Sequence, residues 1–289
     1  MSIEELSFSV RERLQYIEFL LQFRGWLSRS DLVDKFAISA PAATRDFRKY
    51  KDIAPENLDF DDSSKTYTIK DSSFKPVFTI RIHEALGKLR NPALALALGL
   101  GENESYSAPP RLSMPKLDVL MSLSRSIINK QALRINYLSV KNGNSDRKIV
   151  PHSLVDNGLR LHVRAYDYKR KKFCDFVLSR IIKAEQLDEF VPFERTSTLD
   201  YQWNRYVRLE LVPHPCSENV LNPKTIERDL DMKDGVKVIQ VRAAVAGYWL
   251  RLWNVDCSKD ASLRGTEFHL WLRNHETLYD VESAKLAPK

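Results

Sequence analysis

The chain has 289 residues, enough for two or three compact domains that each bury their own core. Its 45 basic and 38 acidic side chains leave a formal net charge of +7, which favours an anionic partner only weakly because the two signs are interspersed. Three scattered cysteines, a start without a leader pattern and no long apolar run argue against disulfides, a structural zinc site, export and a membrane partner, and predict a cytoplasmic protein.

The start of the chain carries apolar residues at helical spacing. They predict a first helix over Val10 to Gly25, where the glycine suits the helix end. A short second helix is predicted over Asp31 to Phe36, with Ser28 or Ser30 as its cap. Two short helices in close succession indicate a small helical domain.

A third helix is predicted to start at Ser39, with Pro41 in its first turn, where the missing N–H costs nothing. Phe47 and Tyr50 are expected to pack inward. The following segment, Asn57 to Lys70, reads as strand, turn and strand. Three short helices and a hairpin predict a winged helix-turn-helix, whose later helix lies in the DNA major groove.

The outward side chains of the third helix are candidates for DNA contact. Thr44 and Arg45 are predicted to read base edges, whereas Arg48, Lys49 and the wing residue Lys65 are predicted to hold phosphates. An alternative is a helical domain that binds protein while its basic helix stays solvated. The predicted DNA-binding set is Ser39, Pro41, Ala42, Thr44, Arg45, Arg48, Lys49 and Lys65.

A connecting region follows the wing. Ile80 to Gly101 reads as an apolar helix too short to span a bilayer, and the proline- and serine-rich stretch Ser105 to Pro115 reads as a joint between domains. Another helix is predicted over Leu117 to Lys130. Its expected buried positions are Leu117, Leu120, Met121, Ile127 and Ile128.

Short strands joined by tight turns come next and predict a strongly bent sheet or barrel of the SH3-like kind. The expected strands are Leu133 to Ser139, Arg147 to Val150, Leu159 to Tyr166, and Phe173 to Ile182.

The strand Leu159 to Tyr166 alternates strictly between apolar and polar residues. Because successive side chains of a strand point to opposite faces, one face carries aliphatic residues and the other carries Arg160, His162, Arg164 and Tyr166. This polar row is a candidate binding face for an anion. The alternative is a solvated sheet face that keeps the edge soluble.

The last third of the chain alternates strands and helices, which suggests a small ferredoxin-like layer. The overall prediction is an α+β multidomain protein with an N-terminal winged helix-turn-helix, a central SH3/Sm-like β-barrel and a C-terminal ferredoxin-like α/β domain. The C-terminal elements are expected at Tyr206 to Leu211, Pro223 to Leu230, Val236 to Ala244, Ala246 to Asn254, and Phe268 to Leu272.

No pattern assembles a catalytic site. The G-x-S-x-G, phosphate-loop, H-E-x-x-H and G-x-G-x-x-G motifs are absent from the sequence. Asp167 and Asp175 stand beside basic residues that neutralise them more simply than a metal would, and His214 with Cys216 offers too few ligands. We therefore expect no enzyme activity, no cofactor and no metal site.

The central motifs resemble the WYL domain, a ligand-sensing domain of bacterial regulators, and the whole chain is similar to the BrxR/CapW regulators. One departure is that Leu161-His162-Val163 stands where the tripeptide that names the domain is expected. The matching segments are I-x-Y at Ile135–Tyr137, R-x-I-x-P-H at Arg147–His152, L-R-x-H-V-R-A-Y at Leu159–Tyr166, F-x-L-S-R-I at Phe176–Ile181, and the C-terminal runs Pro213–Pro215 and Tyr248–Asp256.

The resemblance implies a winged helix in residues 1–75, a helical linker in 76–130, a WYL effector-sensing domain in 131–192, and a WCX-like dimerisation domain in 193–289. It further implies a homodimeric repressor on a pseudo-palindromic double-stranded DNA operator of a phage-defence operon, of the BREX or CBASS type.

An anionic effector, a nucleic acid or a nucleotide, would bind the WYL face and change the affinity for DNA. An alternative function is an accessory nucleic-acid-binding subunit that modulates a partner defence enzyme. The implied effector residues are Tyr137, Ser139, Arg147, His152, His162, Arg164, Tyr166 and Arg180.

Overall fold

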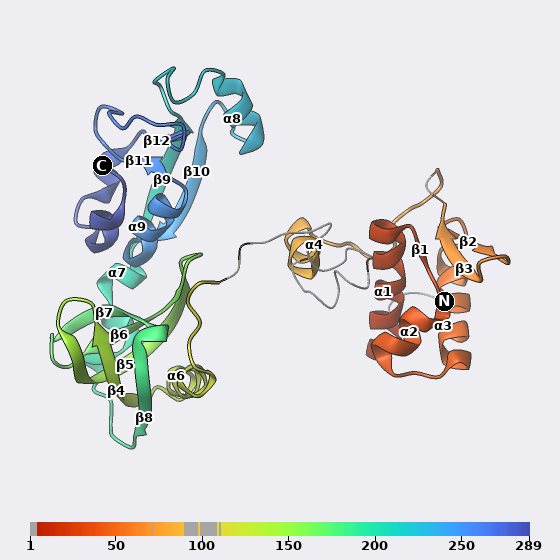
Figure 1. Ribbon diagram of the computed structural model, residues 1–289, viewed down its shortest axis with the longest axis horizontal. Coiled ribbons are helices and arrows are strands. Elements are labelled where there is room, and N and C mark those ends of the chain that lie inside the picture. The colour runs from red at the N-terminus through yellow and green to blue at the C-terminus, as the bar shows by residue number, and fades with distance from the viewer. Residues whose placement is uncertain (1–4, 71, 90–97, 99–108, 110) are drawn as a thin grey trace. The chain divides into compact units, whose positions relative to one another are not determined.

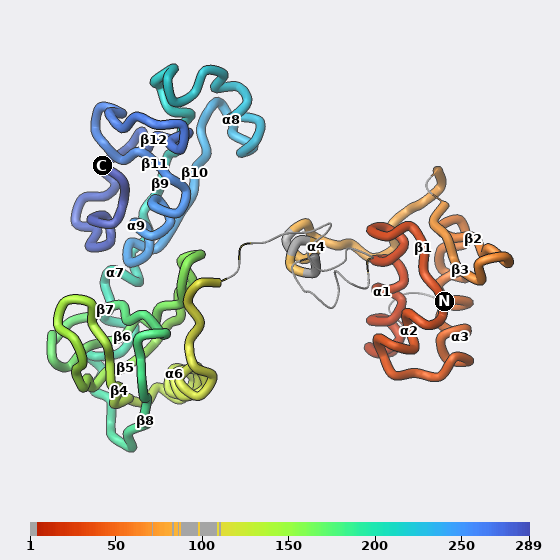
Figure 2. The backbone as a smooth tube through the Cα atoms, in the orientation of Figure 1, coloured from red at the N-terminus to blue at the C-terminus, as the bar shows by residue number. Residues whose placement is uncertain are grey.

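The structure is a computed structural model that describes residues 5–70, 72–89, 98, 109 and 111–289. The chain divides into two compact units, Met1–Pro110 and Arg111–Lys289 (Figures 1 and 2). Among the residues described, no helix has both the length and the apolar content needed to span a bilayer.

The first unit is a helical domain with a small antiparallel sheet, as the sequence predicts. Its strands pair in the order β1-β3-β2, so the β2–β3 hairpin forms the expected wing. The elements are α1 (Phe8–Arg24), β1 (Trp26–Leu27), α2 (Arg29–Phe36), α3 (Ala40–Ile53), β2 (Leu58–Asp61), β3 (Thr66–Ile69) and α4 (Ile82–Leu89).

The ends of α1 and α2 are fixed by local hydrogen bonds. Gly25 adopts a φ of 83°, a left-handed conformation that glycine takes without strain, and ends α1. The N–H of Ser28 donates to Asp31 at 2.7 Å, and the Arg24 guanidinium holds both oxygens of that carboxylate at 2.9 and 2.7 Å. The bidentate pair therefore ties the end of α1 to the first turn of α2.

The helix α3 is anchored by its inner face. Phe47 and Tyr50 are fully buried as expected, and the Phe47 ring stacks on Tyr67 of the wing at 3.8 Å and 8°. On the same face the buried carboxylate of Asp46 accepts a hydrogen bond from Arg13 Nε at 2.6 Å. These contacts hold the helix and the wing as one body.

A buried carboxylate links α1, α3 and the segment that leaves the wing. Glu18 is 2% exposed and accepts hydrogen bonds from the Tyr50 hydroxyl at 2.8 Å and from the backbone N–H groups of Val77 and Phe78 at 2.9 and 2.8 Å. Burial, with a further contribution from Glu18, raises the pKa of Tyr50, so its hydroxyl stays protonated and donates. The amide of Asn57 in turn donates to the Tyr50 oxygen at 3.1 Å.

Replacing Tyr50 by phenylalanine is expected to destabilise this unit by about 1–2 kcal/mol, because the buried Glu18 loses its side-chain donor. Amide hydrogen exchange at Val77 and Phe78 should accelerate by about tenfold. Tyr67→Phe is the matched control, since in the described part of the chain its hydroxyl has no hydrogen-bond partner. Equal exchange rates in the two variants would contradict the role assigned to Glu18.

The connecting region is described in part. Of the helix expected over residues 80–101, α4 accounts for Ile82–Leu89, while residues 90–97 and 99–101 lie outside the described residues. Residues 105–108 and 110 of the expected joint at 105–115 also lie outside them. The helix α6 (Leu117–Asn129) is present as predicted.

Three of the five expected buried positions of α6 are wrong. Leu117, Met121 and Ile128 are exposed, while Leu120 and Ile127 pack on the core of the second unit. The face in contact with the sheet is instead built around Val119, Leu123 and Ser126.

The first part of the second unit is a five-stranded antiparallel sheet in the order β7-β6-β5-β4-β8. The segment expected as one strand over Phe173 to Ile182 is two strands separated by a 3-10 turn. No pairing among the described strands joins β7 to β8, so the expected barrel is not closed. The elements are β4 (Ala132–Ser139), β5 (Gly143–Asp156), β6 (Leu161–Asp167), β7 (Lys172–Val177), η2 (Leu178–Arg180) and β8 (Ile181–Leu187).

The aliphatic residues of β6 face the core, as the alternation in the sequence predicts. Val163 and Ala165 are fully buried against α6 and the rest of the sheet core. Opposite β6, the register of β5 shifts between Pro151 and Ser153, where proline lacks an N–H for the ladder. The bulge leaves His152 out of the paired register.

The C-terminal part is an α+β layer built on a four-stranded sheet in the order β10-β9-β12-β11, in which β11 and β12 are parallel. The strands and helices come close to the predicted positions, but the ferredoxin-like arrangement is not confirmed. The elements are η3 (Phe193–Arg195), η4 (Ser197–Leu199), α7 (Tyr201–Asn204), β9 (Tyr206–Pro213), α8 (Pro223–Asp229), β10 (Lys237–Arg242), α9 (Ala243–Leu252), β11 (Val255–Asp256), β12 (Leu270–Leu272), η5 (His275–Leu278) and η6 (Glu282–Leu286).

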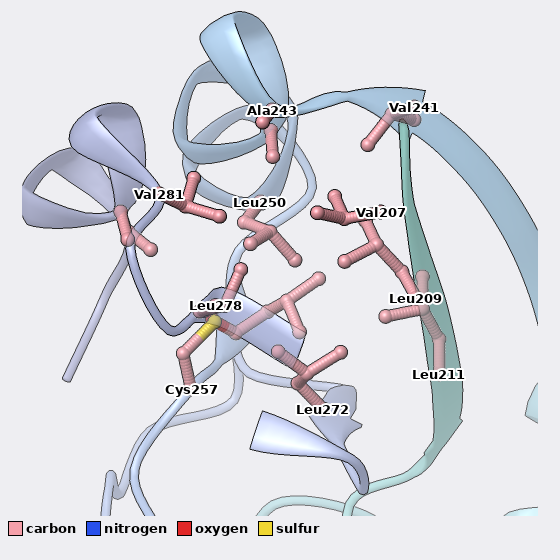
Figure 3. Close-up of a cluster of buried hydrophobic side chains, with 14 of the residues drawn as sticks. Val207, Leu209, Leu211, Val241, Ala243, Leu250, Cys257, Leu272, Leu278 and Val281 are labelled. Atoms are coloured by element: carbon pink, nitrogen blue, oxygen red, sulfur yellow. The ribbon is translucent and has the colours of Figure 1, made fainter. Parts of the chain in front are cut away.

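Figure 3 shows the core of this layer, where Leu209 and Leu211 of β9 face Leu250 of α9. Each fully buried leucine contributes about 2 kcal/mol. A second, smaller apolar cluster joins the two parts of the unit, because Val155 of β5 packs with Ala244 and Val245 of α9. The helix α9 therefore lies against both sheets.

Candidate functional site

The outer face of α3 presents cationic side chains. Arg45 and Arg48 are exposed and Lys49 is half-buried, and in the described part of the chain none of the three forms an ion pair. Ser39 caps the helix, and its hydroxyl accepts the N–H of Ala42 at 3.4 Å. The hydroxyl of Thr44 donates to a carbonyl one turn back at 3.0 Å.

Two further predicted DNA-binding residues are Pro41, in the first turn of α3, and Lys65, on the wing. Pro41 is exposed in the first turn of α3, as expected. Lys65 is exposed at the tip of the wing, where its ammonium lies 3.2 Å from Asp62. An exposed pair of this kind is weak, so it leaves Lys65 available to a polyanion.

The polar row that includes Arg164 of β6 is covered at that residue. Arg164 is 3% exposed, and its guanidinium donates to both oxygens of Asp200 at 2.6 and 2.9 Å and to Asp175 at 3.0 Å. Because Asp200 follows the sheet in sequence and starts α7, the pair ties β6 to the C-terminal part. The guanidinium of Arg164 is thus neutralised inside the unit.

Two more side chains complete this ion-pair network. His152 Nε2 lies 3.1 Å from the Asp200 carboxylate, and Tyr248 of α9 donates its hydroxyl to Asp175 at 3.0 Å. Burial raises the pKa of Asp200, but the hydrogen bonds from His152 and Arg164 outweigh it and hold that pKa below its usual value. The carboxylate therefore stays ionised.

Three other predicted effector residues make contacts of their own. Arg147 is buried and donates to Asp167 at 3.1 Å. The hydroxyl of Ser139 accepts backbone N–H groups in the β4–β5 turn. Tyr166 packs edge-on against Phe173 with ring centroids 5.4 Å apart. None of these three residues is among the described residues that line the groove between the sheet and α9.

A groove of about 550 Å³ lies between the five-stranded sheet and α9. Predicted residues that line it are Tyr137, His162 and Arg180. We call it the α9 groove, and its lining includes Tyr137, Arg160, His162, Arg180, Tyr248 and Arg251.

The α9 groove is cationic. Among the described residues, Arg160, Arg180 and Arg251 form no ion pair, whereas its acidic side chain, Asp175, is already held by Arg164. Unpaired guanidiniums converging on one hollow provide planar paired donors that suit phosphate.

His162 adds a polar atom without a partner. The side chain is 5% exposed, and its Nδ1 has no hydrogen-bond partner in the described part of the chain. Burial lowers the pKa of His162, which the nearby Asp175 offsets only in part. A neutral imidazole with an unsatisfied nitrogen in a cationic groove can hydrogen-bond to a ligand.

The pKa of His162 predicts acid destabilisation. A free histidine titrates near ~6.5, so below that pH the unfolded chain binds a proton that the folded chain resists. The contribution of His162 to stability is thus full above that value and is lost as the pH falls toward the lowered pKa. Urea unfolding at pH 7.5 and 5.5 should lose less stability in His162→Asn than in the unmodified chain, whereas an equal loss would contradict this assignment.

Curated relatives match nearly the whole chain. A DNA-binding transcriptional repressor CapW of Escherichia coli (strain KTE188) is 32% identical over 278 residues, which cover 92% of this chain and 90% of that protein. The CapW repressor of Pseudomonas aeruginosa is also 32% identical, over 93% of this chain and 90% of the relative, and that of Stenotrophomonas maltophilia is 33% identical, over 84% and 83%. The chain belongs to the BrxR/CapW family of regulators.

Family models divide this BrxR/CapW chain into three matched segments. The BrxR transcriptional regulator winged helix-turn-helix domain matches residues 9–91, the WYL domain matches 118–186, and the BrxR C-terminal dimerization domain matches 206–278. The relatives are named as repressors and not as enzymes. No group of three or more His, Cys, Asp or Glu side chains in the described ranges is arranged to hold a metal ion.

The WYL segment and the dimerization segment each contribute to the α9 groove. Tyr248 and Arg251 come from α9, and sequence reasoning did not place them in a site. Two features of the sequence could have indicated that they belong to one site. Residues three apart on a helix share a face, and the run Tyr248–Asp256 resembles the family.

Proposed function

We propose that this chain is a DNA-binding transcriptional repressor that acts as a homodimer on a pseudo-palindromic operator. The observation that carries the proposal is the unpaired cationic face of α3, held rigidly beside a wing. It is supported by the names of the CapW relatives and by the match to a dimerization domain. The operator is proposed to control a phage-defence operon of the BREX or CBASS type.

Within this proposal, Thr44 and Arg45 read base edges in the major groove. Arg48, Lys49 and Lys65 neutralise phosphates and set the register of the protein on the duplex. The small first turn of α3 lets the helix approach the bases closely. It contains the remaining predicted residues Ser39, Pro41 and Ala42.

The effector is proposed to be an anion, a nucleotide or nucleic acid, bound in the α9 groove. Arg160, Arg180 and Arg251 would hold its phosphates, and the half-buried ring of Tyr248 is available for stacking. Because the groove is built from both the WYL segment and the dimerization segment, a bound anion can favour one arrangement of these parts. Such differential affinity is what couples an effector to DNA binding, typically by about 1–3 kcal/mol.

The DNA-binding part is tested by gel shift with the full chain and the promoter upstream of its own gene. Arg45→Ala should weaken operator binding by about 1–3 kcal/mol and relax specificity at one base position. Lys49→Ala should instead weaken binding to all sequences alike and reduce the salt slope by about one unit.

Glu12→Ala serves as a control, because Glu12 is exposed on α1 and carries no base-reading or phosphate-binding role in the proposal. If Arg45→Ala binds as the unmodified chain does at several salt concentrations, the base-reading role is wrong. If the unmodified chain binds its own promoter no better than random DNA, the accessory-subunit alternative is favoured instead.

A further inference from the structure

The chain that enters the second unit is tied to the five-stranded sheet by polar side chains. Residues 111–116, which precede α6, carry these contacts, and we call them the strap. The Arg111 guanidinium donates to both oxygens of Asp156, at 3.2 and 2.5 Å. The hydroxyl oxygens of Ser113 and Ser179 lie 2.7 Å apart. These bonds fix the path by which the chain reaches α6.

The two anchors of the strap adjoin residues that line the α9 groove. Asp156 also accepts the N–H of Gly158 at 3.1 Å, and so it holds the turn that presents Arg160 to the groove. Ser179 belongs to η2, next to Arg180. The strap therefore connects two segments that carry arginines of the groove, although neither Asp156 nor Ser179 is among the described residues that line it.

The strap is held weakly. Leu112 and Met114 are 85% and 68% exposed, so the apolar side chains of the strap add little burial. Arg111 and Asp156 are exposed as well, and ion pairs in solvent contribute little to stability. A segment that is held by a few exposed polar bonds opens at low cost. The strap can therefore open while α6 keeps its own core contacts.

A phosphate in the α9 groove acts on both anchors. When it is gripped by Arg160 and Arg180, it moves the two segments that carry them relative to one another, and a strap bonded to both cannot follow both. Its charge also repels the Asp156 carboxylate. The hydrogen bond from Arg111 lowers the pKa of Asp156, and the imidazole of His162 in the groove contributes in the same direction, so this carboxylate lies within electrostatic reach of the groove.

We propose that the strap transmits anion binding to the DNA-binding unit: an anion in the α9 groove breaks the Arg111–Asp156 and Ser113–Ser179 contacts and frees the chain that joins the two units. The inference rests on the proposed function, because it names how the same site is regulated. Two DNA-binding units of a homodimer must meet two half-sites at one spacing. Freeing the chain that carries each unit makes that arrangement entropically costly, so operator affinity falls.

The first test locks the strap with a disulfide. In Ser113→Cys/Ser179→Cys the two thiols stand close enough to pair, because the hydroxyl oxygens that they replace are 2.7 Å apart. In gel shifts of the full chain on the promoter upstream of its own gene, 5′-phosphorylated hexathymidylate should weaken operator binding by the unmodified chain about tenfold. The oxidised variant should bind the operator equally well with and without this probe, and dithiothreitol should restore the response. Ser113→Cys alone, treated with the same oxidant, is the control.

The second test opens the strap without a new bond. Arg111→Gln should bind the operator about tenfold more weakly before any probe is added, and by linkage it should bind the hexathymidylate about tenfold more tightly in calorimetry. Loss of a positive charge alone would weaken binding of this anion, so tighter binding reports the open strap. Lys183→Gln is the charge-matched control, because it breaks an exposed pair with Glu185 on β8 that lines no part of the groove.

The possible failures are distinguishable. If the oxidised double variant is released by the probe as the unmodified chain is, if its two cysteines do not pair, or if Arg111→Gln binds the probe no more tightly, the strap is wrong while the α9 groove stands. If the probe binds the unmodified chain but leaves operator binding unchanged or tightens it, release through the strap is overturned. If calorimetry shows no binding of the probe to the unmodified chain, the proposed effector function fails together with the strap.

Discussion

Replacing Asp200 by alanine is expected to lower the free energy of unfolding of the second unit by about 3–5 kcal/mol. The carboxylate is 1% exposed and accepts two hydrogen bonds from Arg164, one from the Trp203 N–H at 3.2 Å, and one from His152. Alanine would leave a buried guanidinium with Asp175 as its remaining acidic partner and would remove the cap of α7. The cost arises mainly because the Nε and Nη2 groups of Arg164 and the Trp203 N–H lose their acceptor inside the unit.

Urea unfolding followed by tryptophan fluorescence measures this effect, since four of the five tryptophans lie in the second unit and Trp203 packs on His152 at 5.6 Å. Asp200→Asn should fall between alanine and the unmodified chain, because it retains the shape and an acceptor. Asp188→Ala is the surface control and should change stability by less than about 0.5 kcal/mol. A similar small change in Asp200→Ala would show that the ion-pair network does not join the sheet to the C-terminal part.

Replacing Gly247 by alanine is expected to destabilise the C-terminal part by about 3 kcal/mol or more. A Cβ atom at this position in α9 would lie 1.8 Å from the carbonyl oxygen of Ser283, which is backbone and cannot rotate away. The Gly247 N–H also donates to the Ser283 hydroxyl at 3.0 Å, and that hydroxyl donates to Ala243 at 2.7 Å. Separating η6 from α9 would break both bonds.

The measurement is again urea unfolding, combined with sedimentation to follow the oligomeric state. Gly87→Ala is the matched control, because no atom of the described residues lies within 4 Å of its added Cβ, and alanine should stabilise α4 by about 0.5–1 kcal/mol. Unchanged unfolding of Gly247→Ala would mean that η6 does not pack against α9 as the structure has it.

The elements of the N-terminal domain could be predicted because local chemistry determines them. Gly25 ends one helix, Ser39 with Pro41 starts another, and a polar tip separates two short strands. The inward positions of Phe47 and Tyr50 follow from helical spacing, and both are confirmed. Such features need only a few neighbouring residues.

The state of the polar row could not be predicted in the same way. Alternation separated Arg164 from Val163 and Ala165, and a strand does place them on opposite faces. It could not reveal that Arg164 is covered, because the partner Asp200 stands 36 positions later. The same limit explains α6, where spacing alone did not say which apolar stripe faces the sheet.

The position of the α9 groove depends on similar long-range contacts. Arg251 reaches the same hollow as Arg180 only because α9 packs on β5 through Val155. The turn at Gly158 lies close to the end of that helix, since a Cβ there would meet Leu252 at 3.0 Å. No local pattern in either segment indicates this approach.

The measurement that tests the central claim most directly is a nuclease footprint of the full chain on the promoter upstream of its own gene. A homodimeric repressor that reads bases with α3 predicts two protected half-sites related by a two-fold axis and about one helical turn apart, or a multiple of it. Arg45→Ala should lose both half-sites at the same protein concentration. A single protected site without two-fold symmetry, or uniform weak protection along the whole fragment, would contradict the account.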